Sequence, residues 1–176
     1  MVGRFFEVKG HAFFLKAMAQ VAGRIPGVQV WLAGEGPLEA ELRALCEQLG
    51  IGGRVHFLGY RQDIDQILRA SQVTVIGSAF ETSCRTAMEA LHLGCPLVAT
   101  PVGIIPEMVG DNEAGLLTPY GDVDAMANAL LRMLEEPGLA HRLSQRGLER
   151  CRLSGSHDDA VAGLTAVYAE AMRAKP

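Results

Sequence analysis

Residues 73–107 read VTVIGSAFETSCRTAMEALHLGCPLVATPVGIIPE, and this stretch decides the fold. An apolar run, Val73 to Ile76, is followed by a short loop that carries Glu81. A helical stretch carrying Glu89 then leads to a second apolar run, Pro96 to Ala99. Two short apolar runs joined by a helix are typical of parallel strands buried on both faces.

The two glutamates are an unusual use of charge in a segment flanked by buried strands. On one helix, a spacing of eight residues would cover ~12 Å of the axis and return both side chains to roughly the same side. That arrangement suits an elongated polar ligand held at two points. The alternative is structural, with Glu81 near a helix N-terminus, where the dipole favours it, and Glu89 on a solvated face.

The rest of the chain repeats the alternation of strand and helix. Strands are expected at Met1–Arg4, Val28–Ala33, Val55–Leu58, Val73–Ile76, Pro96–Ala99 and Gly115–Leu117. Helices are expected after Gly10, over Leu38–Leu49 and Asp63–Ala70, after Asp122 as N-cap, over about Leu139–Cys151 after an interruption at Pro137–Gly138, and over about Asp158–Arg173 after the capping stretch SGSHDD (154–159). This order predicts an α/β fold, Rossmann-like, with three layers α/β/α and a parallel sheet of about six strands. The whole chain, 1–176, is expected to form a single domain.

Composition excludes several classes of protein. The formal net charge is -4 and 20% of the residues are charged, which argues against a nucleic-acid binder because such proteins carry a basic face. The sequence has no run of eighteen apolar residues that could span a bilayer, and its N-terminus lacks the apolar core of a signal peptide. We therefore expect a cytoplasmic protein, peripheral to the inner face of the membrane at most.

The four cysteines show no CxxC spacing and lie mostly in apolar surroundings, which indicates buried, reduced thiols. The five histidines are scattered, without an HxH or HExxH pattern. The sequence therefore predicts no catalytic metal.

Candidate binding groups follow the expected strands. Arg4 and Lys9 flank a short loop before the helix that Gly10 opens, and cations beside a helix N-terminus make an anion site. Gly34 and the residues Gly59–Arg61 follow the next two strands, where open parallel sheets bind ligands. The alternatives are two solvated surface cations and plain tight turns.

The order and spacing of these motifs resemble the group 1, or family 4, retaining glycosyltransferases of the GT-B fold. The resemblance rests on GR-x4-KG (3–10), GxGP (34–37), VxFxG (55–59), E-x7-E (81–89) continuing as EALxxGxPLVAT (89–100), the PE that follows, and GLLxPxGD (115–122). It runs from Val2 to about Leu134 and corresponds to the C-terminal, donor-binding domain of such enzymes.

The resemblance implies a role for each matched residue. Arg4 and Lys9 would hold the diphosphate and stabilise the charge on the leaving phosphate, and Glu81 would orient the sugar, so these three form the expected catalytic set. The expected donor-binding set is Glu89, which would hold the ribose, with Thr82, Ser83, Cys84, Arg85, Gly34, Gly59 and Tyr60. Neither a metal nor another cofactor is expected, because the two cations take the place of Mg²⁺.

Two departures from the family pattern affect the sugar pocket. The family commonly has E-G-F-G after the first glutamate, whereas here Thr82, Ser83 and Cys84 follow it. The common Gly-Gly before I-P-E is Gly103-Ile104 here.

The resemblance further implies a partner domain and a pathway. The resemblance covers only the C-terminal domain of a GT-B enzyme and leaves the N-terminal acceptor domain absent. We therefore expect this chain to bind a UDP- or GDP-linked sugar without turnover. We also expect self-association through the face of the cleft that the acceptor domain would cover. The acceptor would be a sugar or lipid of the cell envelope. The rivals are a sugar-nucleotide epimerase of the same fold and a non-catalytic binding module. A Rossmann dehydrogenase is excluded because no G-x-G-x-x-G follows the first strand.

Overall fold

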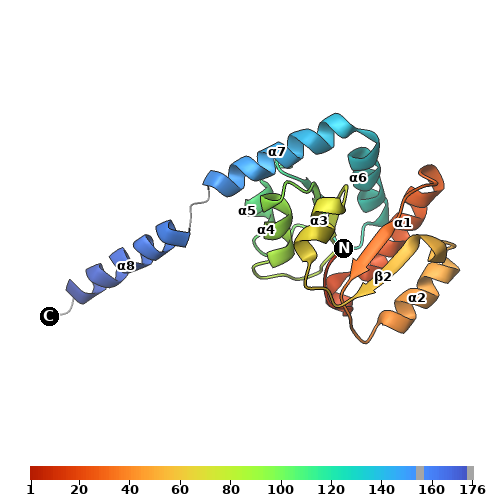
Figure 1. Cartoon of the computed structure of the whole chain (residues 1–176), viewed down its shortest axis with the longest axis horizontal. Helices are drawn as coiled ribbons and strands as arrows, with labels where there is room; N and C mark the ends of the chain where they lie inside the picture. Colours follow the sequence, from red (N-terminus) through yellow and green to blue (C-terminus); the bar gives the residue numbers. More distant parts are fainter. Residues whose placement is uncertain (154–156, 174–176) are drawn as a thin grey trace.

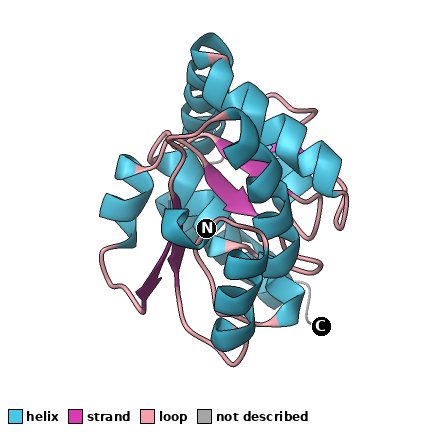
Figure 2. Ribbon diagram, turned by 90° about the vertical axis from the view of Figure 1, so that its right-hand side faces the viewer, coloured by secondary structure: helices cyan, strands magenta, loops and turns pink. Residues whose placement is uncertain are grey.

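The computed structural model describes residues 1–153 and 157–173, with parallel strands at the centre and helices on both sides of them (Figures 1 and 2). Strands β1 (Val30–Ala33) and β2 (Val55–Gly59) pair in parallel. Strands β3 (Thr74–Ile76), β4 (Leu97–Ala99) and β5 (Leu116–Leu117) form a second parallel group in that order. The α/β class and the parallel pairing expected from the sequence are confirmed.

Eight α-helices and two short 3₁₀ helices are assigned within the described residues. The α-helices are α1 (His11–Arg24), α2 (Glu39–Gln48), α3 (Ile64–Ala70), α4 (Arg85–His92), α5 (Ile105–Val109), α6 (Val123–Glu135), α7 (Pro137–Leu153) and α8 (His157–Arg173); the 3₁₀ helices are η1 (Glu7–Lys9) and η2 (Gly52–Arg54).

The sixth strand expected over Met1–Arg4 is reduced to one isolated bridge between Val2 and Ala33. Ala33 N donates to Met1 O over 3.0 Å and Gly3 N donates to Ala33 O over 2.9 Å, so the segment runs parallel to β1. Val2 also packs against the buried cluster that contains Leu68 and Cys95. The segment makes too few consecutive ladder bonds to count as a strand, and the sheet therefore divides into groups of two and three.

One core unites the two strand groups. Leu32 of β1, Val75 of β3 and Val98 of β4 belong to the same buried cluster, in which Leu15 of α1 and Met126 of α6 are fully buried. Burying a side chain of this size stabilises the fold by roughly 1.5–3 kcal/mol. The strands are thereby fixed with their carboxyl ends at one edge, where the loops discussed below emerge.

Helix boundaries follow local chemistry. Asp122 is the N-cap of α6, as expected, and its carboxylate accepts a hydrogen bond from Ala125 N over 2.9 Å. The expected interruption between the two helices is present but lies at Glu136, and α7 begins at Pro137. Proline is well suited to the first position of a helix, because the N–H that it lacks would have no partner within the helix. Residues 154–156 of the expected cap SGSHDD lie outside the described residues.

The last helix, α8, extends away from the other elements (Figure 1). Its large apolar side chains Leu164, Val167 and Tyr168 are exposed. None of the described helices has the length and apolar character needed to cross a membrane.

Candidate functional site

Two hollows adjoin at the carboxyl ends of β1 and β2. The first, of about 610 Å³, is lined by Gly3 and Arg4, by the Gly34–Gly36 loop after β1, and by Tyr60 and Arg61. The second, of about 680 Å³, is lined by the same Tyr60 and Arg61 and by Arg85 and Glu89 of α4. Because Tyr60 and Arg61 line both, the hollows form one continuous surface.

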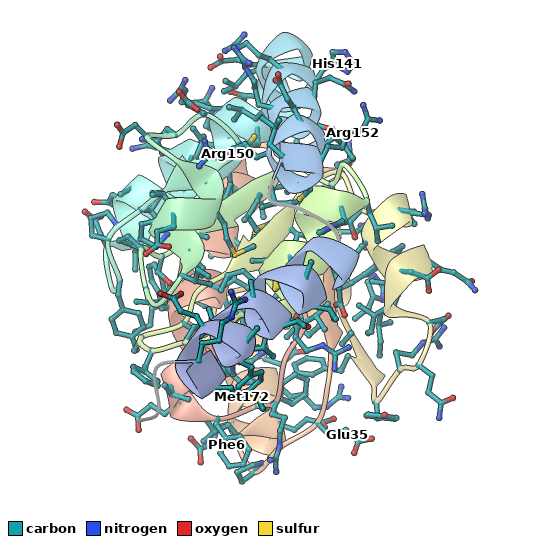
Figure 3. All side chains as sticks on the ribbon, turned by 90° about the vertical axis from the view of Figure 1, so that its left-hand side faces the viewer. Phe6, Glu35, His141, Arg150, Arg152 and Met172 are labelled. Carbon is teal, nitrogen blue, oxygen red and sulfur yellow. The ribbon has the colours of Figure 1, made fainter. Side chains whose placement is uncertain are left out.

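Glu35 joins the loops that follow β1 and β2. Its Oε1 accepts a hydrogen bond of 3.1 Å from Tyr60 N, while Gly34 N donates to Gly59 O over 2.8 Å. Figure 3 shows Glu35 at the same end of the molecule as Phe6. The GxGP loop and the VxFxG loop are thus one unit, and Gly34, Gly59 and Tyr60 come together as expected.

Arg4 is one of two exposed arginines that line the first hollow, the other being Arg61. The Arg4 guanidinium lies 4.6 Å from the centre of the Phe6 ring, a cation–π contact that holds it beside the loop. Lys9 lies close by, because a Cβ added to Gly3 would be 3.9 Å from Lys9 Cδ.

Glu89 presents a carboxylate to the second hollow from the exposed side of α4. Arg85 Nη2 lies 3.2 Å from its Oε1, one helical turn earlier, and the Arg85 side chain is 86% exposed. An exposed pair of this kind contributes little to stability, so the carboxylate remains open to another donor.

Glu81 is held by two donors at one oxygen. Lys9 Nζ and Ser78 Oγ each lie 2.7 Å from Glu81 Oε1. Within the described residues no donor reaches Oε2, which therefore faces no internal competitor. Ser78 is itself buried and fixed, since its carbonyl accepts a bond of 2.6 Å from Thr100 Oγ1.

The two glutamates do not share a helix. Glu81 lies in the loop after β3, and α4 begins only at Arg85. The two side chains are therefore not placed on the same side of one helix, as the E-x7-E spacing suggested. The loop positions Glu81, and α4 positions Glu89.

The loop between Glu81 and α4 takes an unusual conformation at Cys84. Thr82 and Ser83 are exposed, whereas Cys84 is buried and has φ 35°, in the left-handed region that side chains other than glycine rarely adopt. Burial raises the pKa of the Cys84 thiol, so it stays protonated at neutral pH. The Cys84 side chain thus serves packing at the N-terminus of α4.

Gly103 fits directly against this loop. A Cβ on Gly103 would lie 2.3 Å from Glu81 O and 2.8 Å from Thr82 O, closer than atoms can approach. Ile104, which replaces the family's second glycine, is exposed. Only the first position of that glycine pair is therefore needed to accommodate the Glu81 loop.

His11 lies at the first turn of α1, beside the cations. It is 2% exposed, its ring packs edge-on against Phe5, and neither ring nitrogen has a hydrogen-bond partner among the described residues. Burial, together with the positive charges of the Met1 amine and Lys9, lowers its pKa to about 4. His11 is therefore neutral at physiological pH.

Two residues that support the candidate site were not predicted from the sequence. Glu35 and Ser78 were not singled out as functional, and only the position of Glu35 inside GEGP signalled that it would lie in a binding loop. Ser78 and Thr100 have no such signal, because a buried hydroxyl at a strand end is common. Cys46, Cys84 and Cys95 are buried, as expected, whereas Cys151 is only partly buried. Among the described residues no three His, Cys, Asp or Glu side chains gather into a possible metal site.

Comparison with solved structures finds the same fold in other proteins. The chain superimposes on the C-terminal domain of a group 1 glycosyltransferase, LpcC, from Francisella tularensis with a TM-score of 0.78 at 24% identity, covering 86% of this chain and 83% of that one. It also matches the Anabaena protein Alr3699/HepE in complex with UDP-glucose (TM-score 0.82, 27% identity, 99% of this chain and 48% of that one). A third match is the sucrose-phosphate synthase of Thermosynechococcus elongatus (TM-score 0.85, 31% identity, 99% and 46%).

Comparison with curated proteins gives the same class. The chain is 32% identical over 175 residues to the lipopolysaccharide core biosynthesis glycosyltransferase LpsE of Rhizobium meliloti, covering 99% of this chain and 49% of LpsE. It is 32% identical over 180 residues to the D-inositol 3-phosphate glycosyltransferase of Mycobacterium avium, covering 98% and 41%. The chain thus spans about half the length of these relatives.

The model of the family described as "Glycosyl transferases group 1" matches residues 1–150, which include both hollows, the Lys9–Glu81 pair and the Cys84 loop. This chain belongs to the group 1 glycosyltransferases, with the fold of the C-terminal domain of a GT-B enzyme.

Proposed function

We propose that this chain is the donor-binding domain of a retaining glycosyltransferase and binds a nucleotide-diphosphate sugar across the two adjoining hollows. The observation that carries the proposal is that Tyr60 and Arg61 line both hollows, so that Arg4 and Glu89 border one surface. That surface lies at the carboxyl ends of parallel strands, where such folds bind ligands. The likeness to a protein whose structure contains UDP-glucose supports this placement.

The nucleotide and the diphosphate meet different groups. Glu89 accepts hydrogen bonds from the ribose hydroxyls, because a carboxylate is an acceptor only. Gly34, Gly59 and Tyr60 form the wall beside the base, and Arg85 at the rim of the second hollow completes the pocket. Arg4 and Lys9 bind the diphosphate, and UDP or GDP is the nucleotide expected.

Glu81 and Lys9 act at the sugar. With Oε1 engaged by Lys9 and Ser78, Glu81 offers Oε2 to the sugar hydroxyls. Lys9 Nζ has three hydrogens and uses one on Glu81, so it keeps donors for a phosphate oxygen. Thr82, Ser83 and Cys84 contribute backbone N–H groups at the N-terminus of α4.

The protein stabilises the charge that develops as the anomeric bond breaks. Negative charge builds on the leaving phosphate, and fixed cations in a preorganised site favour the transition state over the ground state. Arg4 and Lys9 supply that charge without a metal ion. We infer that the configuration at the anomeric carbon is retained.

The names of the relatives support a proposal for the acceptor and the cellular setting. LpsE is named for lipopolysaccharide core biosynthesis, which supports a sugar or lipid acceptor of the cell envelope and a cytoplasmic enzyme peripheral to the membrane. Because the chain spans about half of LpsE, we infer that residues 1–176, as a single domain, bind the donor and that turnover requires an acceptor domain on the other side of the cleft.

Calorimetric titration with UDP, GDP and ADP tests the proposal. One nucleotide should bind saturably, and Glu89→Ala should weaken it about tenfold or more, the effect of losing a charged hydrogen-bond acceptor. Glu41→Ala, an exposed glutamate of α2, is the matched control and should bind like the wild type. The proposal fails if no nucleotide binds, or if Glu89→Ala binds as tightly as the wild type.

A further inference from the structure

A groove on another part of the molecule lies between α6, α7 and the loop before β5. Its volume is about 560 Å³, and it shares no lining residue with the two hollows. Leu117, Ala125 and Leu143 form its apolar floor, and three arginines stand among its walls: Arg132, Arg142 and Arg146.

The three guanidiniums come from two facing helices. Arg142 and Arg146 lie one turn apart on α7, so their side chains share one side of it, and Arg132 comes from α6. Arg150 continues the same row, and Figure 3 shows it on the opposite side of α7 from Arg152. The row therefore faces a single direction along the helix.

The arginines differ in how they are neutralised. Arg150 has a structural role, because it donates hydrogen bonds to Glu107 O over 2.6 Å and to Met108 O over 2.9 Å. It also engages Glu113, the one carboxylate among the residues that line the groove, at 3.2 Å.

The groove arginines have weaker partners. Arg132 lies 3.4 Å from Glu136, four residues later, and Arg146 lies 2.8 Å from Glu149, three residues later. All four side chains are more than half exposed. Arg142 has no acidic partner within the part of the chain that the structure describes. Exposed pairs of this kind contribute little and exchange readily for a stronger anion.

The arginines of this groove contrast with the negative net charge of the chain. The chain carries a net charge of -4, yet three arginines and a single, already engaged glutamate line one groove. Arg132 and Arg146 have exposed glutamate partners, and an anion bound in the groove supplies Arg142 with the partner that it lacks among the described residues. The planar guanidinium fork binds the oxygens of a phosphate, as it binds those of a carboxylate, through paired charge-assisted hydrogen bonds.

We propose that this groove binds a phosphate group carried on an apolar moiety. Arg142 and Arg146 hold the phosphate, Arg132 faces it from α6, and the leucine and alanine floor receives the carbon chain. Asn112 and Asn128 at the groove add amide donors, since Asn112 uses only its Oδ1, on Leu117 N at 2.7 Å. The ligand is either a soluble phosphate ester or the headgroup of an anionic lipid.

Titration with hexyl phosphate and with inorganic phosphate tests the site. Hexyl phosphate should bind the 176-residue chain saturably and more tightly than inorganic phosphate. Arg142→Gln should weaken it about tenfold, and the double variant with Arg146→Gln further, as expected for lost charged hydrogen bonds. Arg69→Gln removes the same charge from exposed α3 and is the control, expected to bind like the wild type.

Competition and vesicles decide between the remaining explanations. Saturating UDP and the Glu89→Ala variant should leave hexyl phosphate binding unchanged, because the groove shares no residue with the donor hollows. Co-sedimentation with phosphatidylglycerol vesicles but not phosphatidylcholine vesicles, lost in Arg142→Gln, identifies a lipid headgroup; its absence identifies a soluble ester. The proposal is overturned if hexyl phosphate does not bind, binds no better than inorganic phosphate, is displaced by UDP, or binds Arg142→Gln as it binds the wild type.

Discussion

Lys9 Nζ lies 2.7 Å from Glu81 Oε1, although 72 residues separate the two along the chain. Their side chains are 30% and 12% exposed, and the same oxygen accepts a bond from Ser78 Oγ. The cation of the KG motif and the first carboxylate of E-x7-E are therefore one unit of structure. Neither can be changed without altering the environment of the other.

Lys9→Met should destabilise the fold by about 1–3 kcal/mol, because it leaves a mostly buried carboxylate without its charged partner. Adding Glu81→Gln should recover part of that loss, so the two changes will be non-additive by roughly 0.5–3 kcal/mol. Urea unfolding of the two single variants and the double variant measures both quantities.

Arg132→Met is the matched control for this cycle, because its pair with Glu136 is about half exposed on both sides. It should change the free energy of unfolding by less than about 0.5 kcal/mol. Equal effects of Lys9→Met and Arg132→Met would show that the Lys9–Glu81 pair is an ordinary surface contact.

Gly103→Ala should displace the loop that carries Glu81. The new Cβ would lie 2.3 Å from Glu81 O, and the backbone has φ 55°. We expect a loss of stability above about 2 kcal/mol, the sum of left-handed strain and a backbone clash, with weaker nucleotide-sugar binding.

Gly50→Ala separates strain from the clash. Gly50 has φ 69° but no atom within 4 Å of the new Cβ, so only the strain of about 1–2 kcal/mol should appear. Calorimetric titration with the nucleotide sugar should show unchanged affinity in Gly50→Ala. Similar unfolding energies for the two variants would contradict the close approach at Gly103.

The sequence predicts the strands well because their signal is local. Five of the six expected strands fall on β1 to β5 within two residues at either end, since buried parallel strands are continuous apolar segments. A strand was expected at Met1–Arg4 too, but strand assignment depends on ladder partners, and only Val2 finds one. The local pattern of apolar residues does not predict hydrogen bonding between segments that are distant in the sequence.

Motif spacing likewise identifies site residues but not their contacts. Arg4, Tyr60 and Glu89 were expected to bind one ligand, and the two adjoining hollows bring them to one surface. The bond from Tyr60 N to Glu35 and the support of Glu81 by Ser78 depend on how neighbouring loops pack, which no spacing within one loop encodes.

Cys84→Val should cost about 2 kcal/mol more stability than Cys46→Val. Cys84 has φ 35°, where a β-branched side chain clashes with its own backbone, whereas Cys46 lies within the regular helix α2. Both thiols are buried and the same substitution is made at each, so the change in side-chain volume is the same at the two sites. Urea midpoints compare the two variants directly, and equal losses would mean that the loop accommodates a branched residue at Cys84.

Stability should fall between pH 6.5 and pH 4 through His11. Burial lowers its pKa from 6.5 to about 4 in the folded protein. As the pH drops below 6.5 the unfolded chain takes up a proton that the folded chain refuses, so the contribution is fully present above pH 6.5 and is lost toward pH 4. The most it can amount to is about 3 kcal/mol.

His11→Phe removes this proton linkage while keeping an aromatic ring against Phe5, whose ring centre lies 4.9 Å from that of His11. The difference in unfolding free energy between pH 7.5 and pH 5 should therefore be smaller in His11→Phe than in the wild type. His141→Gln, which changes an exposed histidine of α7 (Figure 3), should keep the wild-type difference. Carboxylates titrate equally in all three proteins, so an unchanged difference in His11→Phe would mean that His11 reaches water or a hydrogen-bond partner in solution and is protonated in the folded state.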